Sequence, residues 1–311
     1  MATFQVLSDL HLELYPDFHI NKVTAPYLIL AGDIGIPTST IYKDFISDCS
    51  QLYTRVFIIT GNHEYYGSSI DEIDAYLTQF CNTFTNVTFL NKSYYDITPK
   101  LRIIGTTLWS YIPTQNKARI KFFIQDYSNI KNFTIDTSNN KHEEDTIWIA
   151  EQILHARESN KELIVVTHHA PLTTNTSDPK YANNSLNTAF ATDLMDLLCY
   201  PIKLWIYGHT HYNNLQKIGS LILTCNQKGY SDDHTQFNPD KTIGEIVKQL
   251  KDNGFGENNK SVKILKHKPG CLDKFNDINN PYWSDNSTLL EYVNYYGGIN
   301  GTDVMMIYCL I

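Results

Sequence analysis

Short apolar runs that end in a turn are the most regular feature of the chain. Most are four or five residues long, and glycine or polar turn residues bound them. Runs of this length between turn signals are typical of buried β-strands. The three runs between residues 87 and 104 are joined by turn residues alone, which predicts a meander. In all, the pattern predicts strands over residues 4–7, 27–30, 56–59, 87–90, 94–97, 101–104, 163–167, 203–207 and 221–225.

Between several of these runs, apolar residues recur at helical spacing. The clearest helix is predicted over 142–158, whose apolar residues gather on one face and leave His142 and His155 on the polar face. Because strands alternate with helices along the chain, we expect sheets layered with helices, which is an α/β fold with mixed sheets. The other helices are predicted over residues 39–52, 70–80 and 189–198.

The pattern changes near residue 240. Residues 253–281 are polar and broken by glycine and proline, unlike the regular alternation that precedes them. We therefore expect a main domain over residues 1–239 and a C-terminal extension over residues 240–311, of unknown role and packed on the main domain. Within the extension the pattern predicts a helix over 243–250 and an apolar strand over 304–311 that is tied into the sheet.

Composition narrows the function without identifying it. The chain of 311 residues is 42% hydrophobic and 19% charged, as in ordinary globular proteins. Its net charge of −8 argues against a nucleic-acid binder, which would be basic. No apolar run is long enough to span a membrane, and the first residues resemble a strand rather than a signal peptide. The six cysteines form no paired motif, so we expect a cytoplasmic protein without a disulfide framework.

Polar groups that can bind metals or transfer protons follow five of the predicted strands directly. In an extended segment residues i and i+2 point the same way, so Asp9 and His11 can reach one ion. The five sets hold more imidazoles and carboxylates than one ion takes, which predicts two cations that share a carboxylate. Asp33 is the expected bridge because it is the only carboxylate in its set. The sets are Asp9 with His11, Asp33, Asn62 with His63, His168 with His169, and His209 with His211.

The ligand types also indicate which metals would bind. Imidazole nitrogens and carboxylate or amide oxygens, without a thiolate, suit Mn, Fe, Zn, Co or Ni better than Mg or Ca, and we expect Mn. Any one of these pairs alone is more often structural than functional. Five of them in the same structural position are not independent accidents, and together they favour a metal site.

In their order along the chain, these motifs resemble those of the calcineurin-like metallophosphoesterase superfamily. The motifs that carry the resemblance are Asp9-x-His11, Gly32-Asp33, Gly61-Asn62-His63-Glu64, His168 and Gly208-His209-Thr210-His211. The resemblance covers roughly residues 1–239 and implies a four-layer αββα sandwich with a dimetal site at one edge of the sheets. The chain looks most similar to the small, cytosolic, bacterial-type branch that resembles Ser/Thr phosphatases, through Ser8–Glu13, Gly61–Tyr66, Thr107–Trp109 and Asn226–Tyr230.

The resemblance implies a role for each site residue. Asp33 bridges the two metals, and His63 is a catalytic imidazole that binds neither of them. His168 is preferred to His169 as the ligand because it follows its strand directly, which leaves His169 to support the site and to contact substrate. The first metal would be held by Asp9, His11 and His211, and the second by Asn62, His168 and His209.

These roles imply a phosphohydrolase that acts on a small phosphomonoester or phosphodiester. A hydroxide that bridges the metals attacks phosphorus, while His63 acts as general acid or stabilises the transition state. Asn62 is a further candidate for contacting substrate. Tyr65 and Trp109 are candidates for stacking on a flat substrate group at the rim, and packing between loop and sheet is the alternative for Trp109.

The alternative function is a scaffold or binding protein of the same fold. It would recruit a partner through its surface or its C-terminal extension, and the sequence does not identify such a protein partner. The complete set of expected ligands favours the enzyme.

Overall fold

The first of two sheets comes mainly from the N-terminal third of the chain. The computed structural model describes residues 2–181, 184–233 and 235–244. α1 (Thr40–Leu52) and α2 (Ile70–Cys81) supply two of the crossovers that parallel strands require. β11 (Thr242–Ile243) adds an antiparallel edge beside β1. The parallel strands are, in spatial order, β1 (Phe4–Leu7), β2 (Tyr27–Ala31), β3 (Arg55–Ile59) and β4 (Val87–Phe89).

The second sheet has a parallel centre and antiparallel edges. Its central strands are β6 (Leu101–Thr106), β7 (Glu162–Thr167), β8 (Ile202–Tyr207) and β10 (Leu221–Cys225). β5 (Ser93–Thr98) pairs with β6 at one edge, and β9 (Leu215–Ile218) pairs with β10 at the other. The long helix α5 (Ile135–Glu158) contacts β6 and β7.

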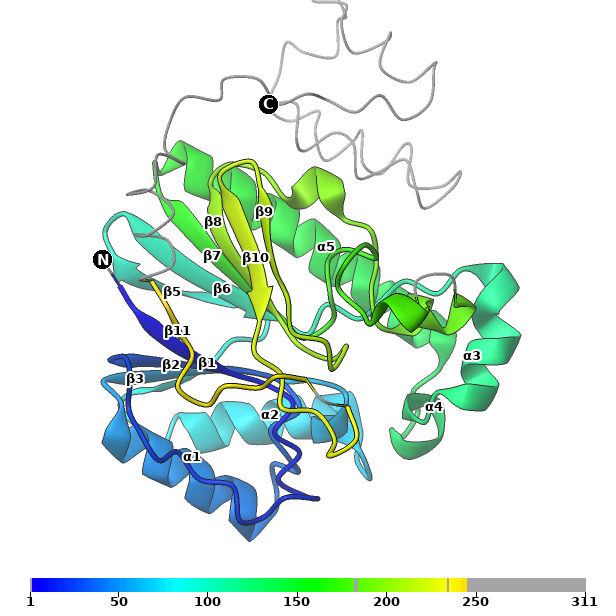
Figure 1. The fold of residues 1–311 in the computed structure, drawn as a ribbon, viewed down its shortest axis with the longest axis horizontal. Helices are drawn as coiled ribbons and strands as arrows, with labels where there is room; N and C mark the ends of the chain where they lie inside the picture. The colour runs from blue at the N-terminus through cyan, green and yellow to red at the C-terminus, as the bar shows by residue number, and fades with distance from the viewer. Residues whose placement is uncertain (1, 182–183, 234, 245–311) are drawn as a thin grey trace, which may run out of the picture. The chain divides into compact units, whose positions relative to one another are not determined.

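Both faces of the first sheet are buried, so its strands are apolar at consecutive positions. Val6, Ile29 and Phe57 face the second sheet and contribute to the core between the sheets. The alternate residues Leu28 and Ile58 pack instead with apolar side chains of α1 and α2. The layers are thus α1 with α2, the first sheet, the second sheet and α5, which confirms the predicted αββα sandwich (Figure 1).

Two predictions about elements are wrong. β4 lies in the first sheet, whereas β5 and β6 lie in the second, so the runs between residues 87 and 104 form no meander. Their short connections gave no signal that the chain passes from one sheet to the other there. The helix predicted over 189–198 is absent, and the region contains the short 3-10 turns Ser185–Ala189 and Met195–Leu197.

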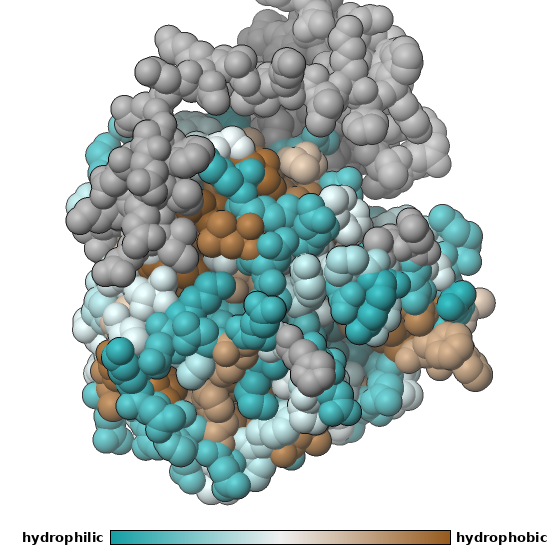
Figure 2. Space-filling model, viewed as in Figure 1, coloured by the Kyte–Doolittle hydropathy of each residue, from teal (hydrophilic) through white to brown (hydrophobic). Residues whose placement is uncertain are grey.

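A helical segment between β6 and α5 was not predicted. It consists of α3 (Lys117–Phe123) and α4 (Asp126–Asn129). α3 buries Ile120 alone, so it lacks the repeated apolar spacing from which a helix is recognised. Phe122 and Phe123 are 82% and 56% exposed, and hydrophobic residues are visible at this edge of the molecule in Figure 2.

The predictions for the C-terminal extension concern residues that the structure largely leaves undescribed. The helix predicted over 243–250 and the strand predicted over 304–311 fall outside the described residues, except for Ile243 and Gly244. The proposed boundary near residue 240 therefore stays a prediction.

Candidate metal centre

The loops that carry the predicted ligands meet at one edge of the sandwich. They follow β1, β2 and β3 in the first sheet and β7 and β8 in the second, each at the carboxyl end of a parallel strand (Figure 1). Backbone hydrogen bonds fix them to one another. Asp9 N donates to the Gly32 carbonyl oxygen at 3.0 Å, and Gly208 N donates to the His168 carbonyl oxygen at 2.9 Å.

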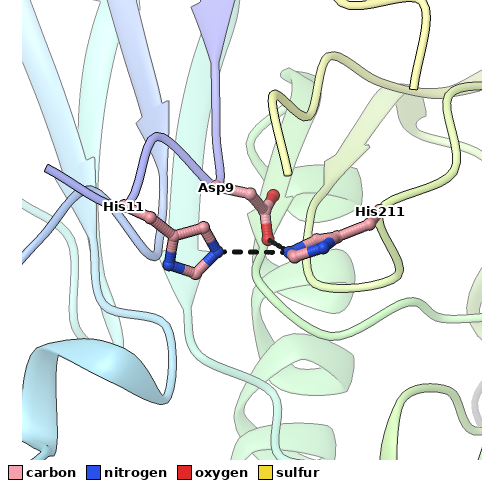
Figure 3. A group of neighbouring side chains, drawn as sticks. All are labelled: Asp9, His11 and His211. Atoms are coloured by element: carbon pink, nitrogen blue, oxygen red, sulfur yellow. Dashed lines mark hydrogen bonds and ion pairs between the residues drawn. The ribbon is translucent and has the colours of Figure 1, made fainter. Parts of the chain in front are cut away.

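The first donor set joins Asp9, His11 and His211, whose side chains point toward one another (Figure 3). His211 Nε2 lies 3.4 Å from Asp9 Oδ1 and 3.2 Å from His11 Nε2. Residues 9 and 11 come from the first sheet and residue 211 from the second. A cation among these three atoms would replace a contact between two imidazoles with two metal bonds.

The second donor set joins Asp33, His168 and His209, with Asn62 beside them. His168 Nε2 lies 3.3 Å from Asp33 Oδ2 and 3.2 Å from Asn62 Oδ1. The same Asp33 oxygen lies 4.0 Å from His11 Nε2 in the first set. Asp33 therefore stands between the two sets.

Hydrogen bonds to carboxylates and carbonyls orient the ligands. Glu13 Oε1 accepts from His11 Nδ1 at 3.1 Å, and Asp233 Oδ2 accepts from His211 Nδ1 at 2.5 Å. Both rings thereby present Nε2 to the site. His168 Nδ1 similarly donates to the Ala31 carbonyl oxygen at 2.9 Å.

The amide of Asn62 is oriented in the same manner by α4. Its Nδ2 donates to Asp126 Oδ1 at 2.8 Å, so Oδ1 faces His168. Asp126 also accepts from the Tyr66 hydroxyl at 2.7 Å. Asn62 therefore presents its oxygen, the only one of its two polar atoms that can bind a cation.

The backbone of the predicted ligands is strained. Five of the seven have φ between +49° and +70°, a region that costs energy for residues other than glycine. Such strain persists where the surrounding structure fixes it, and it concentrates at functional sites. The five are Asp9, His11, Asp33, His209 and His211.

The donor set fits two divalent metals of the borderline class. The seven side chains supply imidazole nitrogens and carboxylate or amide oxygens, and their surroundings orient four of them with the metal-binding atom inward. Six of the seven residues are buried, with at most 8% of their surface exposed. Charged groups this deeply buried need compensation, which bound cations would provide.

His169 takes a different position from His168. Its Nδ1 lies 3.0 Å from Ser110 Oγ, and its ring packs 4.1 Å from that of His209. Within the described residues its buried Nε2 has no hydrogen-bond partner. The ring is thus beside the second donor set without belonging to it, and an unpaired nitrogen remains available there.

His63 lies beside both donor sets and contacts the first through Glu13. Its backbone N–H donates to Asp33 Oδ1 at 2.8 Å, and its ring Nδ1 donates to Glu13 Oε1 at 3.0 Å. Burial opposes ionisation of Glu13, but hydrogen bonds from His11 and His63 outweigh it and lower the pKa of Glu13 to about 2. Burial likewise opposes charging of His63, but Asp33 and Glu13 raise the pKa of His63 to about 9.

Sequence reasoning missed the residues that hold the site in place. Glu64, in the motif next to His63, is fully buried and accepts from the backbone N–H groups of Asp33 at 2.9 Å and Gly61 at 2.6 Å. Glu13 could have been found, because it is a carboxylate only two residues after His11, and the turn over residues 12–14 brings it to the ring. The extended segment expected over Asp9 and His11 is absent, since both residues have left-handed φ values. Asp126 and Asp233 gave no comparable signal, since they lie far in sequence from the residues they contact.

The prediction that Tyr65 and Trp109 stack on a substrate at the rim is wrong. Tyr65 and Trp109 are 1% and 2% exposed and belong to a hydrophobic core, so they do not lie at the rim. The Tyr65 hydroxyl donates to Asp74 Oδ1 at 2.8 Å, and the Trp109 ring packs 4.5 Å from that of Phe133. The alternative prediction for Trp109, that it packs between loop and sheet, agrees with its position in the core.

The structure also buries His142, which was expected on the polar face of its helix.

Comparison with known proteins identifies a family and relatives that match most of the chain. A model of the calcineurin-like phosphoesterase family matches residues 2–213. An uncharacterized protein of Acanthamoeba polyphaga mimivirus is 36% identical over 270 residues, and the match covers 77% of this chain and 95% of that protein. Phosphopantetheinyl hydrolase from Mycobacterium tuberculosis has a similar fold, with a TM-score of 0.56 at 15% identity over 75% of this chain and 91% of that one.

Within the described residues, no helix is both long and apolar enough to cross a membrane.

Proposed function

The protein belongs to the calcineurin-like phosphoesterase family of metal-dependent enzymes, and we propose that it hydrolyses a small phosphomonoester or phosphodiester at this site. The observation that carries the proposal is the position of Asp33 between two donor sets, 4.0 Å from His11 Nε2 and 3.3 Å from His168 Nε2. A carboxylate between two cation sites fits a pair of metals close enough to act on one phosphoryl group.

We assign the seven ligands to two metals in the way that the family resemblance implies. When bound, two divalent cations would activate water for attack on phosphorus and offset the charge of the phosphoryl oxygens. The nitrogen and oxygen donors suit Mn, Fe, Zn, Co or Ni, and Mn is the metal that we propose. Asp9, His11 and His211 would hold the first metal, Asn62, His168 and His209 the second, and Asp33 both.

His63 is the proposed proton donor to the leaving group. Glu13 accepts the hydrogen bond from Nδ1, so Nε2 is the atom that can give a proton to the departing oxygen. The raised pKa of His63 keeps the ring protonated at neutral pH in the metal-free protein. The ring is further fixed by Tyr66, which stacks on it with the ring centroids 4.3 Å apart.

The proposed substrate is small and carries few negative charges. Glu13 and Asp233 contact the imidazoles of the first donor set, and both carboxylates are partly exposed. Their charges would repel a long polyanion such as a nucleic-acid strand. Among the described residues the buried Nε2 of His169 has no hydrogen-bond partner, which supports the proposal that this residue contacts substrate or its attacking water. A cytoplasmic location is part of the proposal, and the free thiols of Cys49 and Cys81 are compatible with it.

The test is hydrolysis of p-nitrophenyl phosphate and bis(p-nitrophenyl) phosphate by metal-stripped protein supplied again with Mn²⁺. We expect turnover that depends on metal and falls about 100-fold or more in Asp33→Asn. Asp71→Asn, on the surface of α2, is the matched control and keeps its activity. His63→Ala should retain metal and lose most of its turnover, whereas equal loss of metal would make His63 a ligand.

The ratio of the two rates separates a phosphatase from a phosphodiesterase. If the protein binds two metals and hydrolyses neither ester with Mn²⁺ or any of the other four metals, the proposed hydrolysis of simple esters is wrong.

A further inference from the structure

Tyr230 covers the first donor set, and no role in the proposed reaction has been given to it so far. Its ring lies 4.7 Å from the ring of His11 and 4.7 Å from that of His211. Its hydroxyl lies 3.3 Å from His63 Nε2, the nitrogen proposed to face the leaving group. The residue is 39% exposed, so an incoming molecule can reach it.

The loop that carries Tyr230 is fixed to the ligand loop after β1. Gly229 N donates to the Asp9 carbonyl oxygen at 3.0 Å, and Lys228 N donates to the Ser8 carbonyl oxygen at 3.0 Å. Gly229 has φ +65°, and a Cβ there would lie 2.9 Å from Asp233 Oδ2 and 3.0 Å from His211 Cγ. The left-handed backbone and the close approach of Asp233 and His211 both favour glycine at position 229, directly before the tyrosine.

One carboxylate connects Tyr230 to the metal ligand beside it. Asp233 Oδ2 accepts from Tyr230 N at 2.7 Å and from His211 Nδ1 at 2.5 Å. The backbone of Tyr230 is therefore fixed to the same carboxylate that orients His211. The contacts of the ring with His11 and His211 then place the side chain over the first donor set.

Tyr66 and Tyr230 both lie beside His63 and use their hydroxyls differently. Tyr66 stacks on the imidazole, and its hydroxyl donates to Asp126 Oδ1 at 2.7 Å. The Tyr230 hydroxyl has His63 Nε2 as its partner within the described residues. Packing alone would place a ring over His11 and His211 without requiring a hydroxyl at that nitrogen.

We propose that Tyr230 is a second hydrogen-bond donor to the phosphoryl group, acting beside His63. Two donors 3.3 Å apart can reach neighbouring oxygens of one tetrahedral phosphoryl group. His63 gives its proton to the leaving oxygen, while Tyr230 keeps its own and donates a hydrogen bond to an oxygen that remains on phosphorus. The inference rests on the proposed function, because it assigns a further contact in the same site.

Tyr230→Phe tests the inference because it removes the hydroxyl and keeps the ring. In the Mn²⁺-loaded protein we expect unchanged metal content, a fall of about 10- to 100-fold in affinity for inorganic phosphate, and a similar fall in kcat/KM. Calorimetric titration with inorganic phosphate measures affinity without turnover. Tyr94→Phe, on the exposed edge strand β5, is the matched control and changes neither quantity.

The dependence on leaving group separates the two donors. For aryl phosphates of increasing leaving-group pKa, the defect of Tyr230→Phe should stay constant, because its hydrogen bond is to an oxygen that does not leave. The defect of His63→Ala should grow along the series, because its proton goes to the leaving group. A defect of Tyr230→Phe that also grows would overturn the assignment to a remaining phosphoryl oxygen.

Other outcomes also contradict the inference. Loss of metal in Tyr230→Phe would make the residue a support for His11 and His211, and equal phosphate affinity in variant and wild type would remove its phosphoryl contact. If the wild-type protein hydrolyses no ester yet binds phosphate more tightly than Tyr230→Phe, the proposed hydrolysis of simple esters fails and the contact stands. If the loaded wild-type protein binds no phosphate, the contact fails as well.

Discussion

Gly61 leaves space for two side chains of the second donor set. A Cβ at this position would lie 2.6 Å from His168 Nε2 and closer still to Asp33 Oδ1. Asp33 and His168 cannot move aside easily, because both are buried and hydrogen-bonded to neighbouring loops. We expect Gly61→Ala to lose metal affinity and activity together, with a loss of about 1–3 kcal/mol in unfolding free energy.

Gly67→Ala is the matched control for that substitution. Gly67 has φ +79° and no atom within 4 Å of the added Cβ, so alanine there adds backbone strain without a steric clash. We expect Gly67→Ala to lower the thermal stability alone. Its metal content, measured by atomic emission, should equal that of wild type. If Gly61→Ala retains both metals, the close approach at Gly61 is not required for the site.

At the scale of single residues, the sequence reveals donors more readily than the groups that orient them. Asp9, His11 and Asp33 could be recognised because each follows an apolar run directly. Asp126 could not, because its contact with Asn62 joins residues 64 positions apart. Tyr65 and Trp109 show the converse error, since an aromatic residue in a ligand loop has the same sequence signature whether it points outward or into the core.

α5 contains a buried histidine that should make the stability of the fold sensitive to acid. His142 Nδ1 donates to the Trp109 carbonyl oxygen at 2.5 Å, and burial lowers the pKa of His142 to about 4. Because this pKa lies below the ordinary value of 6.5, folding favours the neutral ring. The stabilisation is complete above pH 6.5 and is lost as the pH falls through about 4, which amounts to about 3 kcal/mol.

Urea unfolding at a series of pH values measures this contribution. His142→Gln cannot titrate, so its unfolding free energy should fall less than that of wild type between pH 6.5 and 4. His155→Gln, at an exposed position of the same helix, should keep the wild-type slope. Parallel curves for wild type and His142→Gln would show that the ring does not cause the acid sensitivity.

At the scale of elements, predictions held where local pattern decides the structure. Strands such as β1 and β7 are buried on both faces, so their sequences are continuous apolar runs. The sheet to which a strand belongs is decided by partners distant in sequence, which is why β4 and β5 were wrongly placed together. The segment of α3 carries little apolar periodicity, and the turns between residues 185 and 197 carry a helical pattern without forming a helix.

Across the whole molecule, the ligands divide between the two sheets. Loops of the first sheet supply four of the seven, and loops of the second supply the rest. Metal binding should therefore stabilise the packing of the sheets, by about 2.7 kcal/mol for each metal when its free concentration is 100 times its dissociation constant. Of the seven, the first sheet supplies Asp9, His11, Asp33 and Asn62, and the second supplies His168, His209 and His211.

Thermal unfolding with Mn²⁺ or with EDTA measures this stabilisation. The midpoint of wild type and of the surface variant Asp71→Asn should rise with Mn²⁺, and that of Asp33→Asn should rise much less. An equal rise in Asp33→Asn would show that the stabilising metal binds elsewhere.

The core between the sheets has a consequence for how the enzyme acquires its metals. That core joins residues such as Val6, Ile29 and Ile206 through apolar contacts alone and contains none of the donor atoms. The donors of one metal come from positions as far apart as residues 9 and 211, so they assemble only after the sheets have packed. We therefore expect metal loading to follow folding, and exchange of one metal for another to require no unfolding. The working metal would then depend on the supply around the protein as well as on the donor atoms.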